Sequence, residues 1–106
     1  IMAHPRRLRG VLYTGPAAYS VTSCTRDRRN VFHDIEFGRQ AVMQLLARAS
    51  AHRFEVSAYC LMPDHAHLLL TAVGEDAALG PLVRGWKQAT GYLWSRRGEG
   101  RLWQPG

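Results

Sequence analysis

A chain of 106 residues, of which 46 % are hydrophobic and 21 % charged, suits one globular domain. No apolar run reaches the roughly 18 residues of a membrane span, and no apolar stretch follows the basic N-terminus, which argues against a membrane protein or a signal peptide and favours the cytoplasm. The net charge of +6 comes mainly from arginine, whose planar fork suits phosphate. The charge therefore favours nucleic acid as a partner, although an arginine-rich proteome would give the same balance.

Residues 1–16 are basic, and we expect them to form an N-terminal arm before a single domain at residues 17–106. Alternating apolar and polar residues predict a strand at residues 18–24, followed by a basic loop at residues 25–30. Asp34 can cap a helix that should run to about residue 51.

The clearest alternation in the chain lies at residues 54–62 and predicts a strand. Its apolar positions are Phe54, Val56, Ala58, Cys60 and Met62, which should share one face. A short turn then leads to a second strand at residues 65–73, which should pair antiparallel with the first. A second helix should begin near Pro81, and a further strand could lie near Leu102.

The order β-α-β-β-α predicts an α+β fold of the ferredoxin-like, split βαβ type, with an antiparallel sheet and both helices on one face. Cys24 and Cys60 form no CxxC motif and lie in apolar runs, so we expect two buried free thiols.

His65-Ala66-His67 directly follows the turn. Side chains at i and i+2 of a strand point to the same face, so His65 and His67 can bind one metal ion or clamp one phosphate while Ala66 and Leu68 face the core. Two histidines on the solvent side of a sheet would show the same pattern. The absence of CxxC excludes a finger-type zinc site, and Leu69 stands where histidine-triad hydrolases need a third histidine. The pattern leaves a two-histidine site that needs a third ligand.

Several segments, taken in order, resemble the REP-associated tyrosine transposases, which belong to the HUH family (histidine, hydrophobic residue, histidine) of single-strand DNA transposases. The matching segments are Gly15-Pro16-Ala17-Ala18-Tyr19-Ser20-Val21-Thr22, Asn30-Val31-Phe32 with Asp34, Tyr59-Cys60-Leu61-Met62-Pro63-Asp64, His65-Ala66-His67, Lys87-Gln88-Ala89-Thr90 and Leu102-Trp103-Gln104. Together they span nearly the whole chain, which makes the ordered set far more specific than the HUH motif alone.

This resemblance implies that His65 and His67 are catalytic metal ligands for Mg²⁺ or Mn²⁺. The ion polarises the scissile phosphate of single-stranded or hairpin DNA, and a tyrosine attacks to leave a 5′-phosphotyrosine. Relatives are monomers or homodimers. In the family the tyrosine and a third, amide-bearing ligand lie on a helix some twenty residues after the Trp-Gln motif.

The chain ends at Gly106, so we expect a truncated protein that lacks the nucleophile and is inactive by itself. Tyr92, late in the second helix, is the fallback nucleophile, while Tyr13, Tyr19 and Tyr59 are expected to be packing residues. The first strand also departs from the family, which usually has histidine where this chain has Ser20.

Two basic groups are expected to contact DNA. They are Arg26, Arg28 and Arg29 in the loop, and Arg84, Lys87 and Gln88 on the polar stripe of the second helix. A solvated charged face explains each group equally well. Two other functions stay open: a non-catalytic nucleic-acid-binding remnant, and an unrelated metal-dependent phosphodiesterase.

Overall fold

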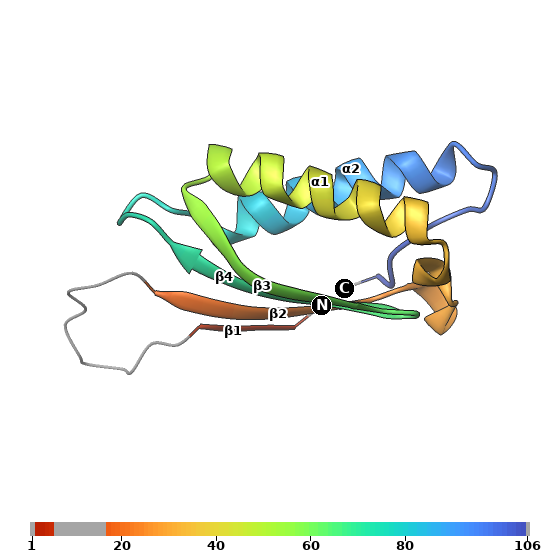
Figure 1. Ribbon diagram of the computed structural model, residues 1–106, viewed down its shortest axis with the longest axis horizontal. Helices are drawn as coiled ribbons and strands as arrows, with labels where there is room; N and C mark the ends of the chain where they lie inside the picture. Colours follow the sequence, from red (N-terminus) through yellow and green to blue (C-terminus); the bar gives the residue numbers. More distant parts are fainter. Residues whose placement is uncertain (1, 6–16, 106) are drawn as a thin grey trace.

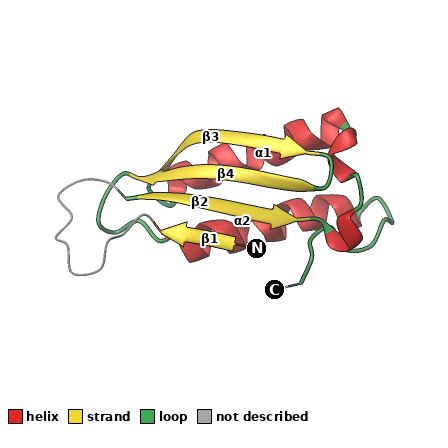
Figure 2. Ribbon diagram, turned by 90° about the horizontal axis from the view of Figure 1, so that it is seen from below, coloured by secondary structure: helices red, strands yellow, loops and turns green. Residues whose placement is uncertain are grey.

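The computed structural model describes residues 2–5 and 17–105, which form a two-layer α+β fold (Figure 1). Four antiparallel strands make one sheet in the order β1-β2-β4-β3, with bounds Met2–Pro5 (β1), Ala18–Cys24 (β2), Phe54–Met62 (β3) and His65–Ala72 (β4). Helices α1 (Ile35–Ala51) and α2 (Leu79–Ser95) both cover the same face of the sheet. The predicted ferredoxin-like arrangement is thus confirmed, and the other sheet face is open (Figure 2).

The edge position next to β2 is filled by the N-terminal strand β1, in which Ala3 pairs with Val21. Residues 2–5 were expected within the arm. Four residues that end in proline carry no clear alternation, so only their pairing with β2 reveals them as a strand. The remainder of the predicted arm, residues 6–16, lies outside the described residues.

Strand β3 contains an irregularity in register between Val56 and Ala58. A bulge of this kind adds one residue and reverses the side-chain alternation beyond it. Leu61 therefore lies opposite the buried Ala66, whereas Cys60 and Met62 turn to the open face. The prediction of one continuous apolar face at residues 54–62 is wrong in its second half.

The bulge also corrects the expectation for the cysteines. Both are free thiols, as predicted, but Cys60 is exposed and Cys24 only half-buried. Both belong to the open face, because they pair with the histidine positions of β4: Cys60 with His67, and Cys24 with His65.

The cap predicted for the first helix is present. The backbone N–H of Phe37 donates to Oδ1 of Asp34 at 3.0 Å. The buried stripe of α1 follows the helical period and contains Phe37, Gly38, Ala41, Leu45 and Ala49. Leu46, placed on that stripe by its spacing, is 51 % exposed instead. The second helix begins at Leu79, with Pro81 inside its first turn.

A cluster of tryptophans closes the core at the end of the sheet where β4 begins. The rings of Trp86 and Trp103 lie 5.0 Å apart, and the indole N–H of Trp86 donates to the backbone oxygen of Ala41. The segment around Trp103 forms a single antiparallel bridge to Thr25 rather than the strand suggested near Leu102. That bridge holds the C-terminal segment against the basic loop.

Candidate functional site

The two histidines share the open face of the sheet. Along β4, Ala66 and Leu68 are buried under the helices, while His67 is exposed and His65 is half-buried on the opposite side. Their ring centroids lie 4.7 Å apart, with the planes nearly perpendicular at 87°. The structure therefore brings the predicted pair together on a rigid central strand.

Each imidazole uses its Nδ1 atom within the protein. Nδ1 of His65 lies 2.7 Å from Oδ1 of Asp64, and Nδ1 of His67 lies 2.8 Å from the hydroxyl of Thr22. A carboxylate only accepts, so the His65 ring donates its Nδ1–H, and in the neutral form of the ring the lone pair is then on Nε2. A hydrogen bond that holds one ring nitrogen in this way orients the other nitrogen towards a possible metal ion.

Asp64 connects the two histidines, called the histidine platform below, to the basic loop at residues 25–30. Its carboxylate also accepts from Nε of Arg28 at 2.9 Å, and its backbone oxygen accepts from the N–H and hydroxyl of Thr25. The hydrogen bond from His65, followed by that from Arg28, lowers the pKa of Asp64 below its usual range. The carboxylate is therefore ionised, and it holds the His65 ring firmly.

The donor set suits a metal ion only in part. Within residues 2–5 and 17–105, no group of three His, Cys, Asp or Glu side chains is arranged to hold a metal. Two neutral imidazoles fit Mn²⁺ and the later transition metals better than Mg²⁺, which prefers oxygen ligands. The pair therefore supplies two ligands and needs at least one more.

The loop arginines differ in their roles. Arg26 and Arg28 are exposed beside the histidine platform, with Arg28 tied to Asp64. Arg29 is half-buried and donates to the backbone oxygens of Glu99 and Arg101. Its guanidinium thus holds the C-terminal segment in place, which the sequence pattern did not indicate.

The second predicted DNA-binding group lies in the helical layer, on the other side of the sheet from the histidines. Arg84 and Gln88 are exposed, and Lys87 is half-buried with Nζ 5.6 Å from the centre of the Trp103 ring. Burial lowers the pKa of Lys87. The helix that carries this group therefore belongs to a different layer of the fold from the histidines.

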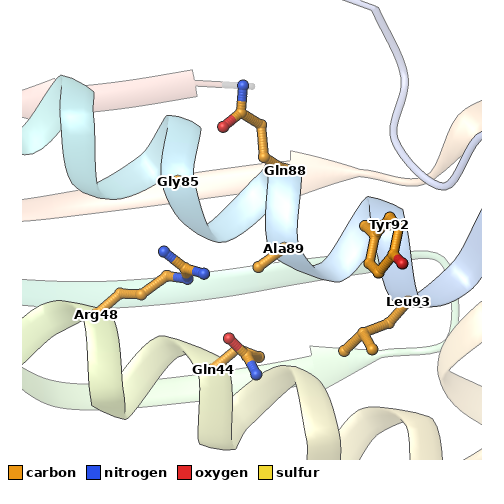
Figure 3. Close-up of a pocket in the computed structure, with 7 residues that line it drawn as sticks. All are labelled: Gln44, Arg48, Gly85, Gln88, Ala89, Tyr92 and Leu93. Atoms are coloured by element: carbon orange, nitrogen blue, oxygen red, sulfur yellow. The ribbon is translucent and has the colours of Figure 1, made fainter.

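None of the described tyrosines lies on the histidine face. Tyr19 packs edge-on against Phe54, and Tyr59 lies opposite the buried Leu68. Tyr92 is 61 % exposed and lines a groove between the two helices, in the layer that covers the opposite face of the sheet (Figure 3). Tyr13 falls outside the described residues.

Two site residues were missed by sequence reasoning, Thr22 and the carboxylate of Asp64. Asp64 immediately precedes His65 in the chain, so the sequence could have indicated a contact between its carboxylate and the ring. Thr22 lies 45 residues from its partner His67, and only the pairing of β2 with β4 brings them together. Ser20, on the same side of β2, lies opposite Leu69.

No helix in the described part of the chain combines the length and apolarity of a membrane span.

Comparisons with known proteins agree with this fold. The sequence model of the family described as "Transposase IS200 like" matches residues 15–106. A protein of Deinococcus radiodurans R1, assigned as a transposase, is 27 % identical with a TM-score of 0.70, covering 95 % of this chain and 81 % of that chain. A comparison with curated proteins gives no match.

A second solved structure, a REP-associated tyrosine transposase bound to a REP hairpin, has a TM-score of 0.70 at 20 % identity and so shares the fold. The alignment covers 94 % of this chain and 58 % of that one, so the chain spans little more than half of that protein's length. The resemblance seen in the ordered motifs is confirmed by the family match over most of the sequence. The chain belongs to the family of IS200-like transposases.

Proposed function

We propose that this chain provides the metal-binding and DNA-binding part of a transposase that cleaves and joins single-stranded DNA. The observation that carries the proposal is the histidine pair, in which both Nδ1 atoms are held by the protein. Metal-ligating histidines are usually oriented in this way, by a hydrogen bond from the ring nitrogen that does not bind the ion. Family membership gives this geometry its chemical meaning.

His65 and His67 would hold a divalent ion through their Nε2 atoms. Mg²⁺ or Mn²⁺ bound there supplies Lewis-acid polarisation of a phosphate oxygen. Asp64 and Thr22 fix the two rings, so their contribution is orientation rather than contact with the ion. A third ligand has to come from outside the His, Cys, Asp and Glu groups of the described residues.

The proposed partner is single-stranded or hairpin-ended DNA. The solved REP-associated transposase of the same fold is bound to a REP hairpin. In this chain, Arg26 and Arg28 stand exposed next to the histidine platform, where they can contact phosphates that flank the one held by the metal. The strongly basic balance of the whole chain supports the same partner.

Strand cleavage through a 5′-phosphotyrosine needs a tyrosine on the open face, and none of the described ones is there. We therefore propose that the described residues bind metal and DNA and that none of their tyrosines forms the covalent adduct. The nucleophile would be supplied from outside residues 2–5 and 17–105.

The test combines a metal readout with a DNA readout. Electron paramagnetic resonance of free Mn²⁺ measures metal binding, and fluorescence anisotropy of hairpin-ended single-stranded DNA measures affinity with Mn²⁺ and with EDTA. We expect Mn²⁺ binding and a metal-dependent gain in affinity, both lost when His65→Ala and His67→Ala are combined. Denaturing gels should show no protein–DNA adduct. An adduct that disappears in Tyr92→Phe would contradict the proposed source of the nucleophile.

The incomplete ligand set among the described residues also favours a second function, a nucleic-acid-binding remnant without catalysis. In that case, the double histidine variant would bind DNA as tightly as the wild type and respond to Mn²⁺ in the same way. The same experiment therefore separates the two functions.

A further inference from the structure

The outer surface of the helical layer contains a groove between α1 and α2 that the histidine site does not use. It is lined by Gln44, Arg48, Gly85, Gln88, Ala89, Tyr92 and Leu93. In Figure 3, Arg48 reaches from α1 towards α2, Tyr92 stands on α2, and the Gln88 side chain points away from α1 at the far rim. This groove contains two residues predicted for other roles, Tyr92 and Gln88.

Arg48 is the unusual member of this groove. Its Nε atom is buried and has no hydrogen-bond partner, and the guanidinium forms no ion pair within the described part of the chain. The buried Nε–H has lost water without gaining a partner, which is costly, and an anion bound to the guanidinium would offset that cost electrostatically. By contrast, Arg39 on the same helix is already bonded to Glu36 through two nitrogens.

The fold leaves room for Arg48 at Gly85. A Cβ atom there would lie 3.6 Å from Nη1 of Arg48, so alanine would just touch the guanidinium and any longer side chain would displace it. The absence of a side chain on α2 thus creates the space in which the guanidinium lies against the neighbouring helix.

The residues around Arg48 favour a ligand in which an anionic group is attached close to a flat aromatic ring. No acidic residue lines the groove, and α2 contains none at all. The amide of Gln44 can donate to the same anion. Tyr92 presents an exposed ring, and the guanidinium of Arg96 lies 5.8 Å from its centre. Proteins that bind single strands without sequence preference pair a cationic groove with aromatic stacking surfaces.

From this arrangement we propose that the inter-helix groove binds the phosphodiester backbone of single-stranded DNA, with Arg48 as the phosphate anchor and Tyr92 as a stacking surface for a base. This surface lies on the opposite side of the molecule from the histidines and needs no metal. It goes beyond the proposed function because it adds a second contact that would remain if the histidines held no ion.

The test measures binding of fluorescein-labelled oligo(dT) of about 20 nucleotides in EDTA, which silences any metal-dependent contact. Arg48→Gln removes the anchor charge, and Arg39→Gln on the same helix is the matched control, since it removes an equal charge that is already paired. We expect Arg48→Gln to weaken binding about tenfold and to reduce the slope of log K against log salt by about 0.7, the value for one phosphate contact on a single strand. Arg39→Gln should change both quantities much less.

Tyr92 is tested with the same oligonucleotide. Tyr92→Ala should weaken binding several-fold, whereas Tyr92→Phe, which keeps the ring, should bind like the wild type. Equal affinities and equal salt slopes for Arg48→Gln and Arg39→Gln would overturn the proposal, and so would an unchanged affinity for Tyr92→Ala. Neither result would contradict the proposed role of the histidines, because metal-dependent binding of hairpin DNA is measured separately.

Discussion

Alternate residues of strand β4 differ in burial, because one face of the strand packs against the helices and the other is open. Towards the helices, Leu68 and Leu70 are almost completely buried. Towards the open side, His65 and His67 hold their rings through hydrogen bonds to Asp64 and to strand β2. The packed face therefore fixes the backbone of β4, and this backbone in turn fixes the two imidazole rings on the other side.

The helical layer shows the reverse relation. Its inner side packs against the sheet, but on its outer side Nε of Arg48 has no hydrogen-bond partner among the described residues. On the open sheet face, Nδ1 of each histidine has a hydrogen-bond partner in the protein, whereas in the groove Nε of Arg48 has none among the described residues. The former arrangement favours orientation of an ion, and the latter favours capture of a phosphate.

The largest expected effect comes from comparing substitutions at two neighbouring residues of β4, one on each face of the strand. Leu70→Ala creates a cavity under the helices and should lower the free energy of unfolding by about 2–5 kcal/mol. Leu69→Ala, on the open face, should cost about 1 kcal/mol or less, because this side chain is already 37 % exposed. Urea unfolding followed by tryptophan fluorescence measures both, and equal losses would contradict the assignment of faces.

A smaller effect tests whether hydrogen bonding to the rings matters. Thr22→Val removes the hydroxyl at Nδ1 of His67 but keeps the side-chain shape, so Mn²⁺ affinity should fall about 10–100-fold with little change in stability. Thr71→Val is the control, because its hydroxyl lies on the same face but pairs with Ser57. Calorimetric Mn²⁺ titration compares the three proteins. An affinity loss shared by both variants would speak against a specific role for Thr22.

The smallest effect concerns the helical layer and depends on pH. The backbone N–H of Phe37, followed by Arg97, lowers the pKa of Asp34 below its ordinary value of 3.8. Ionised Asp34 therefore stabilises the fold fully above about pH 4, and that stabilisation is lost as the pH falls through the lowered value.

Asp34→Asn keeps the helix cap but loses the ion pair with Arg97, so its free energy of unfolding should be lower than wild type at pH 7. The difference should shrink towards pH 2, as measured by urea unfolding at several pH values. Asp27→Asn is the control, because it removes the same charge from an exposed side chain whose contact with Arg26 is long, at 3.9 Å. This variant should lower the free energy of unfolding at pH 7 much less. A constant difference across the pH range would refute the link to Asp34.

Local pattern was sufficient for the helices, the three main strands and the placement of both histidines on one face. Helical and strand periods depend on neighbouring residues, and the strong alternation around Ala66 and Leu68 made the side of each histidine readable. Cap chemistry likewise identified Asp34. The prediction failed at β3, where one extra residue at a bulge leaves no mark in composition but reverses every later side chain.

The sequence by itself determined the order of the two helices and the three main strands, the family, and the identity of the two candidate metal ligands. Only the tertiary structure decided that Thr22 contacts His67, that β1 closes the sheet edge, and that Arg48 and Tyr92 line the same groove. The physical reason is the same in all three cases. Contacts between residues far apart in the chain depend on strand register and helix packing, and neither leaves a periodic signal in the residues themselves.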